Sequence, residues 1–301
     1  MAYWQWGNPD SEHLVVCVHG LSRQWRDFDV LAKALCDLTA LHPGGVRVVC
    51  PDVVGRGKSD WLSDPMGYQI PFYVADMLSL LASLQVQAPI TKLDWVGTSM
   101  GGLIGMVVCG QFNALNILAN STATPAPSIK TIPYPRKLVL NDVGPAIQWQ
   151  AILRIGSYLG QSGHFNTLQE AADAMWAISS GFGPHTPEQW LALTQHMVRP
   201  VSADDDKLCL HYDPTIALPF KQASEASTQD GEAMLWQLYD HITAQTLLLR
   251  GINSDLLSLE TAHAMTQRGP QAQLVEFSGV GHAPTIIADD QVAVVTDFLL
   301  D

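Results

Sequence analysis

The feature that most constrains this chain is an alternation between short apolar, β-branched runs and longer segments with helical patterns. Continuous apolar strands separated by helices are typical of a parallel sheet that is covered by helices on both faces. The sequence therefore predicts an α/β fold. The strand candidates of the first half are residues 14–18, 46–50, 93–96 and 138–140, and the helix candidates lie near 25–40, 72–86 and 101–117.

The second half of the chain contains a long segment with few strand signals. Helical patterns dominate between about 144 and 240, for example at 168–178 and 187–198, and strand-like runs resume at 246–249 and 274–277. Because strands resume, an insertion explains this segment better than a separate domain that begins near 144. We therefore predict a core of residues 1–143 and 241–301, a helical cap of residues 144–240, a surface loop at the Pro/Thr/Ser-rich residues 119–136 and a last helix near 285–300.

The composition indicates a large folded core and excludes some classes of binding partner. Apolar residues make up 47% of the 301 residues and charged residues 15%, which excludes intrinsic disorder and a coiled coil. The 16 Lys and Arg against 29 Asp and Glu give a formal net charge of −13, so neither nucleic acid nor an anionic membrane surface is an expected partner. No run reaches about 18 apolar residues, so no membrane insertion is expected.

The start of the chain and its cysteines give an expectation about location. Residues 1–13 lack the basic and apolar regions of a secretion signal. The five cysteines are scattered without a CxxC pair, which favours free thiols in a reducing compartment over disulfides or a zinc site. We therefore expect a cytoplasmic protein.

A candidate nucleophile follows the third strand. Gly97-Thr98-Ser99-Met100-Gly101 match G-x-S-x-G, with an apolar run before them and a helical pattern after them. A sharp strand–turn–helix connection exposes the serine hydroxyl, the glycines leave room where a Cβ would clash, and the helix N-terminus adds N–H groups and a positive dipole end. We predict that Ser99 is a nucleophile rather than an inert serine in a tight turn.

Two backbone N–H groups are candidates for binding an oxyanion, as a tetrahedral acyl intermediate requires. Met100 directly follows the predicted nucleophile, and Leu21 follows His19-Gly20 at the end of the first strand. We predict that the N–H groups of Leu21 and Met100 form this site. His19 is predicted to shape the loop through local hydrogen bonds rather than to act as a base.

The candidate base is His282, because it alone among the ten histidines lies in a small-residue loop between the last strand and the last helix. Two acids compete to orient it. Asp255 follows the strand at 246–249 and Asp142 follows the strand at 138–140, so both lie near carboxyl ends of strands, where ligands bind in open α/β sheets. The chain order Ser, Asp, His favours Asp255, whereas Asp142 is predicted to cap or brace the junction with the cap.

Some residues are candidates for binding substrate. Arg23 lies two residues past Leu21, where it is suited either to a substrate carboxylate or to a salt bridge with Asp27. Trp176 is a candidate for an apolar acyl pocket, although packing on a helical face is the favoured interpretation for it and its neighbours Met175 and Trp190.

One segment imitates a phosphate-binding loop. Residues 55–59 (GRGKS) end like G-x-x-x-x-G-K-[ST], but position 52 holds Asp where the pattern needs Gly. A Trp/Pro-rich stretch rather than a helix follows. Nucleotide binding is therefore not predicted.

The predicted strands, the turn around Ser99 and the predicted site residues together make this chain resemble the α/β-hydrolase superfamily over nearly its whole length. The resemblance implies an eight-stranded, mostly parallel central sheet with a helical cap inserted after the sixth strand. Within the superfamily the chain looks like capped esterases and related carbon–carbon bond hydrolases, and Ser99 stands where epoxide hydrolases and haloalkane dehalogenases carry Asp. The matching features are His19-Gly20-Leu21, residues 52–59, the turn around Ser99, Asp255 and His282.

These sites predict a carboxylesterase-like serine hydrolase that cleaves esters of small to medium acyl chains and needs no metal or organic cofactor. Ser99 attacks the carbonyl, His282 takes its proton and Asp255 orients the imidazole. A carbon–carbon bond hydrolase that acts on a dienoate diketone is an alternative with the same triad, and Arg23 would then be its basic clamp. A non-catalytic ligand-binding protein on the same fold is another. The sequence leaves monomer or homodimer open.

Overall fold

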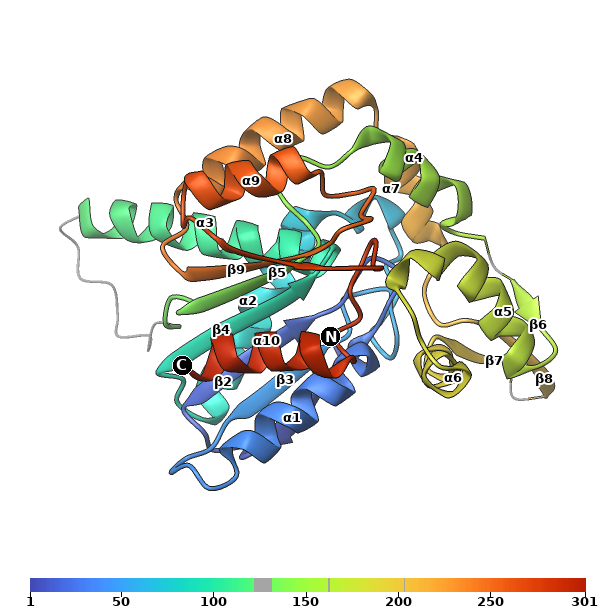
Figure 1. The fold of residues 1–301 in the computed structure, drawn as a ribbon, viewed down its shortest axis with the longest axis horizontal. Helices are drawn as coiled ribbons and strands as arrows, with labels where there is room; N and C mark the ends of the chain where they lie inside the picture. The colour runs from blue at the N-terminus through green and yellow to red at the C-terminus, as the bar shows by residue number, and fades with distance from the viewer. Residues whose placement is uncertain (122–131, 162, 203) are drawn as a thin grey trace.

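The computed structural model describes residues 1–121, 132–161, 163–202 and 204–301. Its centre is a seven-stranded sheet with the strand order β1-β3-β2-β4-β5-β9-β10 (Figure 1). β1 runs antiparallel to β3, and the other neighbouring pairs are parallel. The predicted α/β fold with a mostly parallel sheet is thus confirmed. The strands are β1 (Tyr3–Gly7), β2 (His13–Val18), β3 (Arg47–Pro51), β4 (Lys92–Thr98), β5 (Lys137–Asn141), β9 (Gln245–Gly251) and β10 (Gln273–Phe277).

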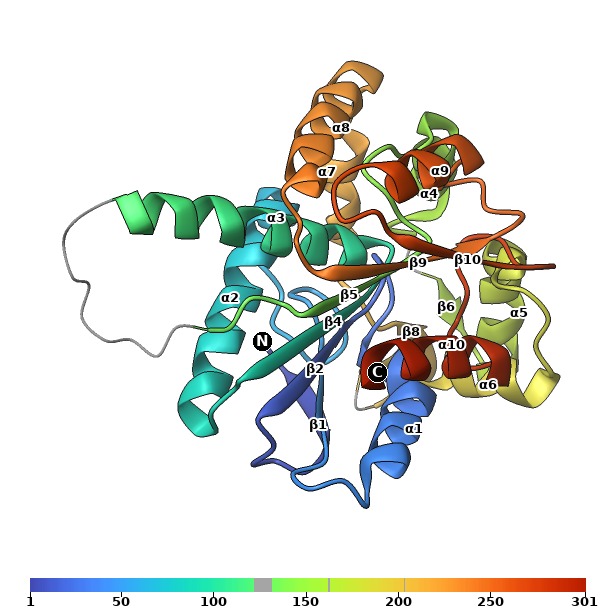
Figure 2. The same cartoon turned by 60° about the vertical axis from the view of Figure 1, so that its left-hand side comes forward.

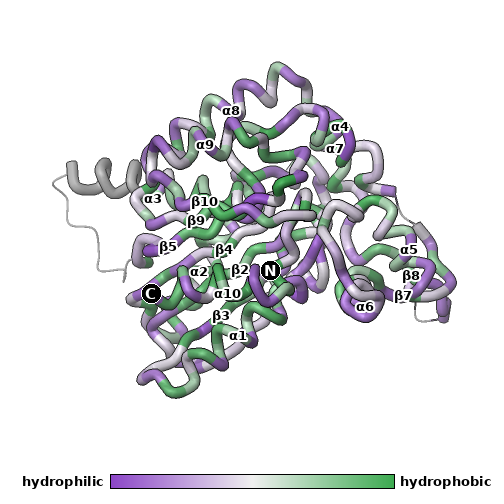
Figure 3. Tube along the Cα trace, viewed as in Figure 1, coloured by the Kyte–Doolittle hydropathy of each residue, from purple (hydrophilic) through white to green (hydrophobic). Residues whose placement is uncertain are grey.

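The alternation of side chains along each strand divides the apolar residues between two cores. In β2, Leu14, Val16 and Val18 pack into one core, while Val15 and Cys17 pack into the other. All five side chains are fully buried. A strand that is covered on both faces needs apolar residues at every position, which explains the continuous runs in the sequence. Figure 3 shows the same concentration of apolar residues along the central strands.

Helices cover both faces of the sheet. Figure 2 shows α1 and α10 on one side and α2 and α3 on the other. Leu31 and Leu35 of α1 share a core with Val295 and Leu299 of α10, whereas α2, α3, α8 and α9 contribute to the opposite core. The helices are α1 (Asp29–Thr39), α2 (Ile70–Gln87), α3 (Met100–Ser121), α8 (Glu225–Asp240), α9 (Leu259–Gln267) and α10 (Asp289–Leu300).

The segment between β5 and β9 forms the insertion that the sequence predicted as a helical cap. Besides helices it holds a small antiparallel sheet with the order β6-β8-β7, which the sequence did not predict. α8, at the end of this segment, packs against α3 and so covers the central sheet. The other elements are α4 (Trp149–Tyr158), β6 (His164–Phe165), α5 (Leu168–Ser179), α6 (Pro187–Gln195), β7 (Val198–Ser202), β8 (Asp205–Leu210) and α7 (Ala217–Lys221).

Some details differ from the sequence prediction. The described sheet has seven strands where about eight were expected, and the insertion follows the fifth strand of this sheet rather than the sixth. β1 was missed because it is an edge strand whose Trp, Tyr and Gln side chains are only half-buried, so it lacks a β-branched apolar run. Most of the loop predicted at 119–136 lies outside the described residues. Within the described ranges, no helix combines the length and apolarity needed to cross a membrane.

Two helical glycines allow a test of the contact between α3 and α8. A Cβ added to Gly110 in α3 would lie 2.6 Å from the carbonyl oxygen of Leu238 in α8, whereas a Cβ on Gly231 in α8 would meet nothing within 4 Å. We predict that Gly110→Ala lowers the free energy of unfolding by about 1–3 kcal/mol, because the added methyl group overpacks the interface. Gly231→Ala should instead raise it by about 0.5–1 kcal/mol, because alanine loses less backbone entropy than glycine in a helix.

Urea denaturation followed by circular dichroism measures both variants. Gly231→Ala is the matched control for the change in helix propensity. If both substitutions stabilised the protein to the same extent, the close approach of the two helices at Gly110 would be wrong.

Candidate active site

Ser99 occupies the sharp turn between β4 and α3. Its φ is +51°, in the left-handed region that side chains other than glycine rarely adopt. Close packing holds the turn in place: a Cβ on Gly101 would lie 2.0 Å from the carbonyl oxygen of Val18, so only glycine fits there. The Ser99 N–H donates to the carbonyl oxygen of Asn141 at 3.0 Å, which ties the turn to the end of β5. The strained backbone thereby presents the hydroxyl at the carboxyl edge of the sheet.

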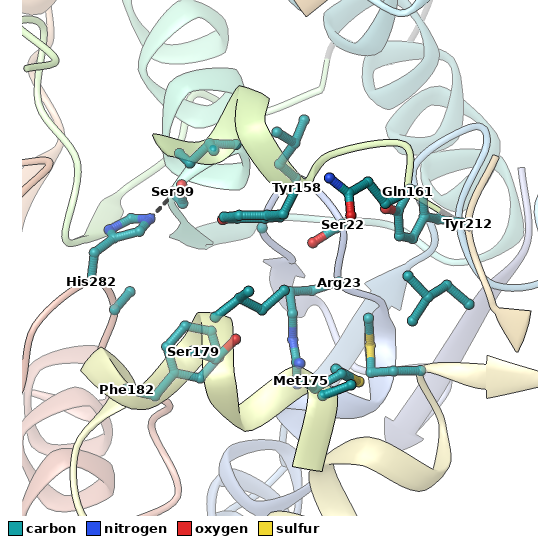
Figure 4. Close-up of a pocket in the computed structure, with 18 of the residues that line it drawn as sticks. Ser22, Arg23, Ser99, Tyr158, Gln161, Met175, Ser179, Phe182, Tyr212 and His282 are labelled. Carbon is teal, nitrogen blue, oxygen red and sulfur yellow. Dashed lines mark hydrogen bonds between the residues drawn. The ribbon is translucent and has the colours of Figure 1, made fainter. Parts of the chain in front are cut away.

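His282 reaches this hydroxyl from the loop between β10 and α10. Its Nε2 lies 3.0 Å from Ser99 Oγ (Figure 4). Asn141 Nδ2 donates to the carbonyl oxygen of Pro284 at 2.7 Å, and so fastens the histidine loop to the sheet. The sequence prediction that Ser99 and His282 meet over one sheet edge agrees with this geometry.

Asp142 is the carboxylate that contacts His282. Its Oδ2 lies 2.8 Å from His282 Nδ1, so the neutral imidazole donates from Nδ1 and its Nε2 is free to accept the serine proton. The Asp142 side chain is fully buried. Its Oδ1 accepts the N–H of Gly251 at 2.9 Å, and its Oδ2 accepts the hydroxyl of Ser254 at 2.6 Å. The carboxylate is therefore fixed on the sides away from the histidine.

Asp255, the acid that the sequence favoured, does not reach His282, and this expectation needs correction. Its side chain is 49% exposed and pairs with Arg154 of α4, with Oδ2 2.6 Å from Nε. The physical reason is the turn after β9. Ser254 points inward to Asp142, so the next side chain along the chain points outward. Chain order alone did not distinguish two acids that follow neighbouring strands.

The loop after β2 runs beside Ser99 and brings Leu21 to the site. A Cβ on Gly20 would lie 3.8 Å from Ser99 Cβ, so the backbone of this loop borders the nucleophile. Met100 is the first residue of α3, and N–H groups in a first helical turn have no partner within the helix. The two predicted oxyanion donors thus lie on segments that adjoin Ser99.

His19 has the structural role that the sequence predicted. Its Nδ1 lies 2.7 Å from the carbonyl oxygen of Gly20, and its Nε2 accepts the N–H of Val53 at 2.9 Å. The ring therefore donates from Nδ1 and accepts at Nε2, which requires the neutral form. Complete burial lowers the pKa of His19 to about 3, so the ring stays neutral at working pH.

A cavity of about 280 Å³ opens above Ser99 and His282. Most of its wall is apolar and comes from both the core loops and the insertion. Figure 4 shows Ser99 and His282 at one end, and Gln161 and Tyr212 at the other. Met175 lines this cavity. The space is thus elongated away from the nucleophile and lies at the small end of ligand sites.

Trp176, a candidate for the pocket, is not among the residues that line it. It follows Met175 in α5, and consecutive helical side chains point about 100° apart. Its side chain is 39% exposed and stacks edge to face on Trp190, with ring centroids 5.0 Å apart. Trp176 therefore packs on Trp190, in line with the favoured interpretation, and its candidacy for the acyl pocket needs correction, because Met175 is the residue of this pair that lines the cavity.

Arg23 lines the cavity and also forms the salt bridge considered from the sequence. Its Nε and Nη2 donate to the carboxylate of Asp27 at 2.7 and 2.6 Å. Its remaining nitrogen, Nη1, is buried without a hydrogen-bond partner in the described structure. The guanidinium also lies over the ring of Phe182, 5.6 Å from its centroid.

Sequence reasoning missed Asn141 and Ser254. Asn141 ends β5 and holds the histidine loop, and Ser254 braces Asp142. The one available signal was the position of Asn141 directly after the apolar run at 138–140, and no pattern in the sequence singled out Ser254. Among the described residues, no group of three His, Cys, Asp or Glu side chains is placed to hold a metal ion. Chemically, the arrangement is suited to attack by a serine oxygen on a carbonyl carbon.

Comparison with known proteins identifies relatives over the full length of the chain. A family model described as "Alpha/beta hydrolase family" matches residues 15–296. A 3-hydroxybutyrate-oligomer hydrolase from Cupriavidus necator is 44% identical over 299 residues, which cover 99% of this chain and 92% of the relative.

Solved structures share the fold. An alpha/beta hydrolase from Novosphingobium aromaticivorans has a TM-score of 0.77 at 33% identity and is matched over 99% of this chain and 93% of its own. A protein from Rickettsia typhi has a TM-score of 0.79 at 27% identity, with coverage of 99% and 90%.

Substitutions of Asp142 and Asp255 should have different effects on the reactivity of Ser99. Asp142→Asn should slow the labelling of Ser99 by a fluorophosphonate by on the order of 10⁴-fold, because the histidine loses the carboxylate that sets its tautomer. Asp255→Asn should leave the rate within about twofold, because it removes an exposed ion pair that contributes little. Labelling rates measured by mass spectrometry decide between them, with thermal unfolding as the control for folding. A larger loss in Asp255→Asn would restore the acid favoured from chain order.

Proposed function

Because this chain belongs to the alpha/beta hydrolase family, we propose that it is a serine hydrolase of ester bonds and that short oligoesters of 3-hydroxyacids are its substrates. The observation that carries the proposal is the hydrogen-bonded series Ser99–His282–Asp142 at one end of an apolar cavity. The full-length likeness to a hydrolase of 3-hydroxybutyrate oligomers supports the choice of substrate.

The mechanism follows from the atoms that face each other. His282 Nε2 takes the proton of Ser99 Oγ as this oxygen attacks the ester carbonyl, and Asp142 stabilises the imidazolium that forms. The N–H groups of Leu21 and Met100 bind the oxyanion. Collapse of the intermediate breaks the ester C–O bond, and the imidazolium protonates the leaving alkoxide. A water molecule, deprotonated by His282, then attacks the acyl carbon, and the imidazolium returns the proton to Ser99 Oγ as the bond between this oxygen and the acyl carbon breaks.

The cavity supports a short substrate rather than a polymer chain. Its volume of about 280 Å³ suits a molecule of a few hydroxyacid units. The apolar wall, which includes Ile155, Met175 and Phe182, suits the methyl and methylene groups of such a unit. Because the cavity extends away from Ser99 toward Tyr212, it has room for a second unit beside the scissile ester.

Arg23 provides a hydrogen-bond donor in this cavity for the second hydroxyacid unit. An unsatisfied buried donor costs about 1–3 kcal/mol, and an oxygen of the substrate would satisfy Nη1. In an oligomer of 3-hydroxyacids, a second carbonyl or the terminal carboxylate follows the scissile ester after a two-carbon spacer. We assign this oxygen to Arg23, whereas a simple alkyl ester offers none.

We propose that the insertion acts as a cap that selects substrate, since it supplies much of the cavity wall. The five cysteines are free thiols, which supports a reducing compartment such as the cytoplasm.

A panel of substrates tests the function. The wild-type protein should hydrolyse the dimer and trimer of 3-hydroxybutyrate and a short p-nitrophenyl ester. Ser99→Ala should lose both activities by on the order of 10⁴-fold or more, because the nucleophile is gone. Ser79→Ala, which removes an exposed hydroxyl of α2, is the matched control.

The other outcomes separate the alternatives. Cleavage of a dienoate diketone without ester hydrolysis would identify a carbon–carbon bond hydrolase. Binding of ligand with neither turnover nor labelling of Ser99 would identify a non-catalytic protein.

A substitution of Arg23 tests the substrate preference. Arg23→Met should lower kcat/KM for the 3-hydroxybutyrate dimer by about 10- to 100-fold, in line with the loss of a hydrogen bond to a charged group. It should leave kcat/KM for p-nitrophenyl butyrate within about threefold. Arg26→Met is the matched control, because Arg26 pairs with Asp29 and does not line the cavity. An equal loss on both esters would contradict a role in recognising the second unit.

A further inference from the structure

Arg56 is a buried cation that lies behind the proposed oxyanion site. Its side chain is completely buried. Its Nε donates to the carbonyl oxygen of Leu21 at 2.8 Å, and its Nη2 lies 3.5 Å from Met100 Sδ. One guanidinium thus contacts both residues whose N–H groups are proposed to bind the oxyanion, although these residues lie 79 positions apart in the sequence.

The rest of the guanidinium is held by uncharged groups. Its Nη1 donates to the carbonyl oxygen of Val54 at 2.7 Å and to the hydroxyl of Tyr73 at 3.0 Å. Its Cζ lies 5.0 Å from the ring centroid of Tyr73 and 5.8 Å from that of Tyr68. Within the described chain, no carboxylate forms a salt bridge with it. The nearby carboxylate of Asp213 accepts the Tyr68 hydroxyl at 2.5 Å and acts on Arg56 electrostatically without contacting it. The positive charge is therefore only partly offset, and it acts on its surroundings through a medium of low dielectric.

The backbone around Arg56 is fixed as well. The N–H of Gly57 donates to the carbonyl oxygen of His211 at 3.0 Å, and the N–H of Asp213 donates to the carbonyl oxygen of Gly55 at 2.7 Å. These bonds join the turn to the segment of the insertion that carries Tyr212, which lines the cavity. The guanidinium consequently has a rigid base from which to hold the two donors.

We propose that Arg56 is a positioning residue for the oxyanion site, which holds Leu21 and Met100 in place and adds a nearby positive charge that favours the oxyanion of the tetrahedral intermediate. This inference rests on the proposed function, because it needs Ser99 to form a tetrahedral intermediate. The oxygen carries negative charge in the intermediate but not in the bound ester. The contribution of Arg56 therefore belongs to the transition state, and its loss lowers kcat rather than raising KM.

Two substitutions separate the geometry from the charge. Arg56→Lys keeps a positive charge but cannot donate to Leu21 and approach Met100 at once, and Arg56→Met removes both functions. On p-nitrophenyl butyrate, kcat should fall by about 10- to 100-fold in the Lys variant and by about 10²–10³-fold in the Met variant, comparable with the loss of an oxyanion donor. KM should stay within about threefold for both.

Readouts beyond activity distinguish positioning from a general loss of structure. The inhibition constant of a trifluoromethyl ketone, which forms an oxyanion on Ser99, should rise in parallel with the loss of kcat/KM. Arg47→Lys is the matched control, because Arg47 is also completely buried but begins β3, at the opposite end of the sheet from Ser99. It should reduce thermal stability without changing kcat at a temperature where the protein is folded.

The inference is overturned if the folded Lys variant keeps the wild-type kcat, if KM alone changes, or if Arg47→Lys loses the same kcat. Labelling of Ser99 by a fluorophosphonate provides a rate that does not depend on the identity of the ester. If the wild-type protein and the Arg56 variants were labelled equally fast, the role of Arg56 would be refuted, while the proposed function would stand. Wild-type protein that neither labels nor hydrolyses any ester would refute the proposed function itself.

Discussion

The hydrogen bond between His282 Nδ1 and Asp142 Oδ2 joins two residues that are 140 positions apart, and the rest of the site depends on it. It exists because β5, β9 and β10 are parallel neighbours, so their carboxyl ends emerge at one edge of the sheet. Asp142 follows β5 directly, with a φ of +54° that turns its side chain toward the edge. The carboxylate then sets the tautomer of the imidazole, which leaves Nε2 to accept the proton of Ser99. The topology of the sheet thus determines which ring nitrogen of His282 faces the carboxylate and which faces Ser99.

The sequence was sufficient for the parts of the fold that periodicity and local chemistry control. The apolar runs predicted the parallel strands of the sheet. The G-x-S-x-G turn predicted Ser99, and the small-residue loop predicted His282. The choice between Asp142 and Asp255 failed because it depends on φ at one residue and on the inward turn of Ser254. Neither is visible as a pattern. The sequence also did not show which helical side chain faces the cavity. Met175 lines it and the next residue, Trp176, does not, because consecutive side chains of a helix point in different directions.

The glycine-rich segment at 55–59 resembles a phosphate-binding loop, but its glycines serve the packing of the turn. Asp52 Oδ1 accepts the N–H of Trp25 at 3.1 Å, and its Oδ2 accepts the N–H of Lys58 at 2.9 Å. A Cβ on Gly57 would lie 2.1 Å from Asp52 Oδ2, so the glycine is required by an internal carboxylate. A carboxylate that fills the concave side of the turn leaves no space for a phosphate. The turn instead presents Arg56, the residue between its two glycines, to the active site.

The insertion contacts the catalytic loop through the short turn Ser180–Phe182 and also through His185, whose Nε2 lies 3.0 Å from Thr285 Oγ1. The carbonyl oxygen of Gly181 accepts the N–H of Gly281, next to His282, at 2.5 Å. The neighbouring ring of Phe182 packs against the guanidinium of Arg23. Any movement of the insertion that widened the cavity at this turn would therefore disturb both the loop that carries the base and the residue proposed to recognise the second hydroxyacid unit. The proposed selection of substrate by the insertion would consequently share these contacts with the alignment of the base, because the turn that shapes the pocket wall also supports the loop of His282.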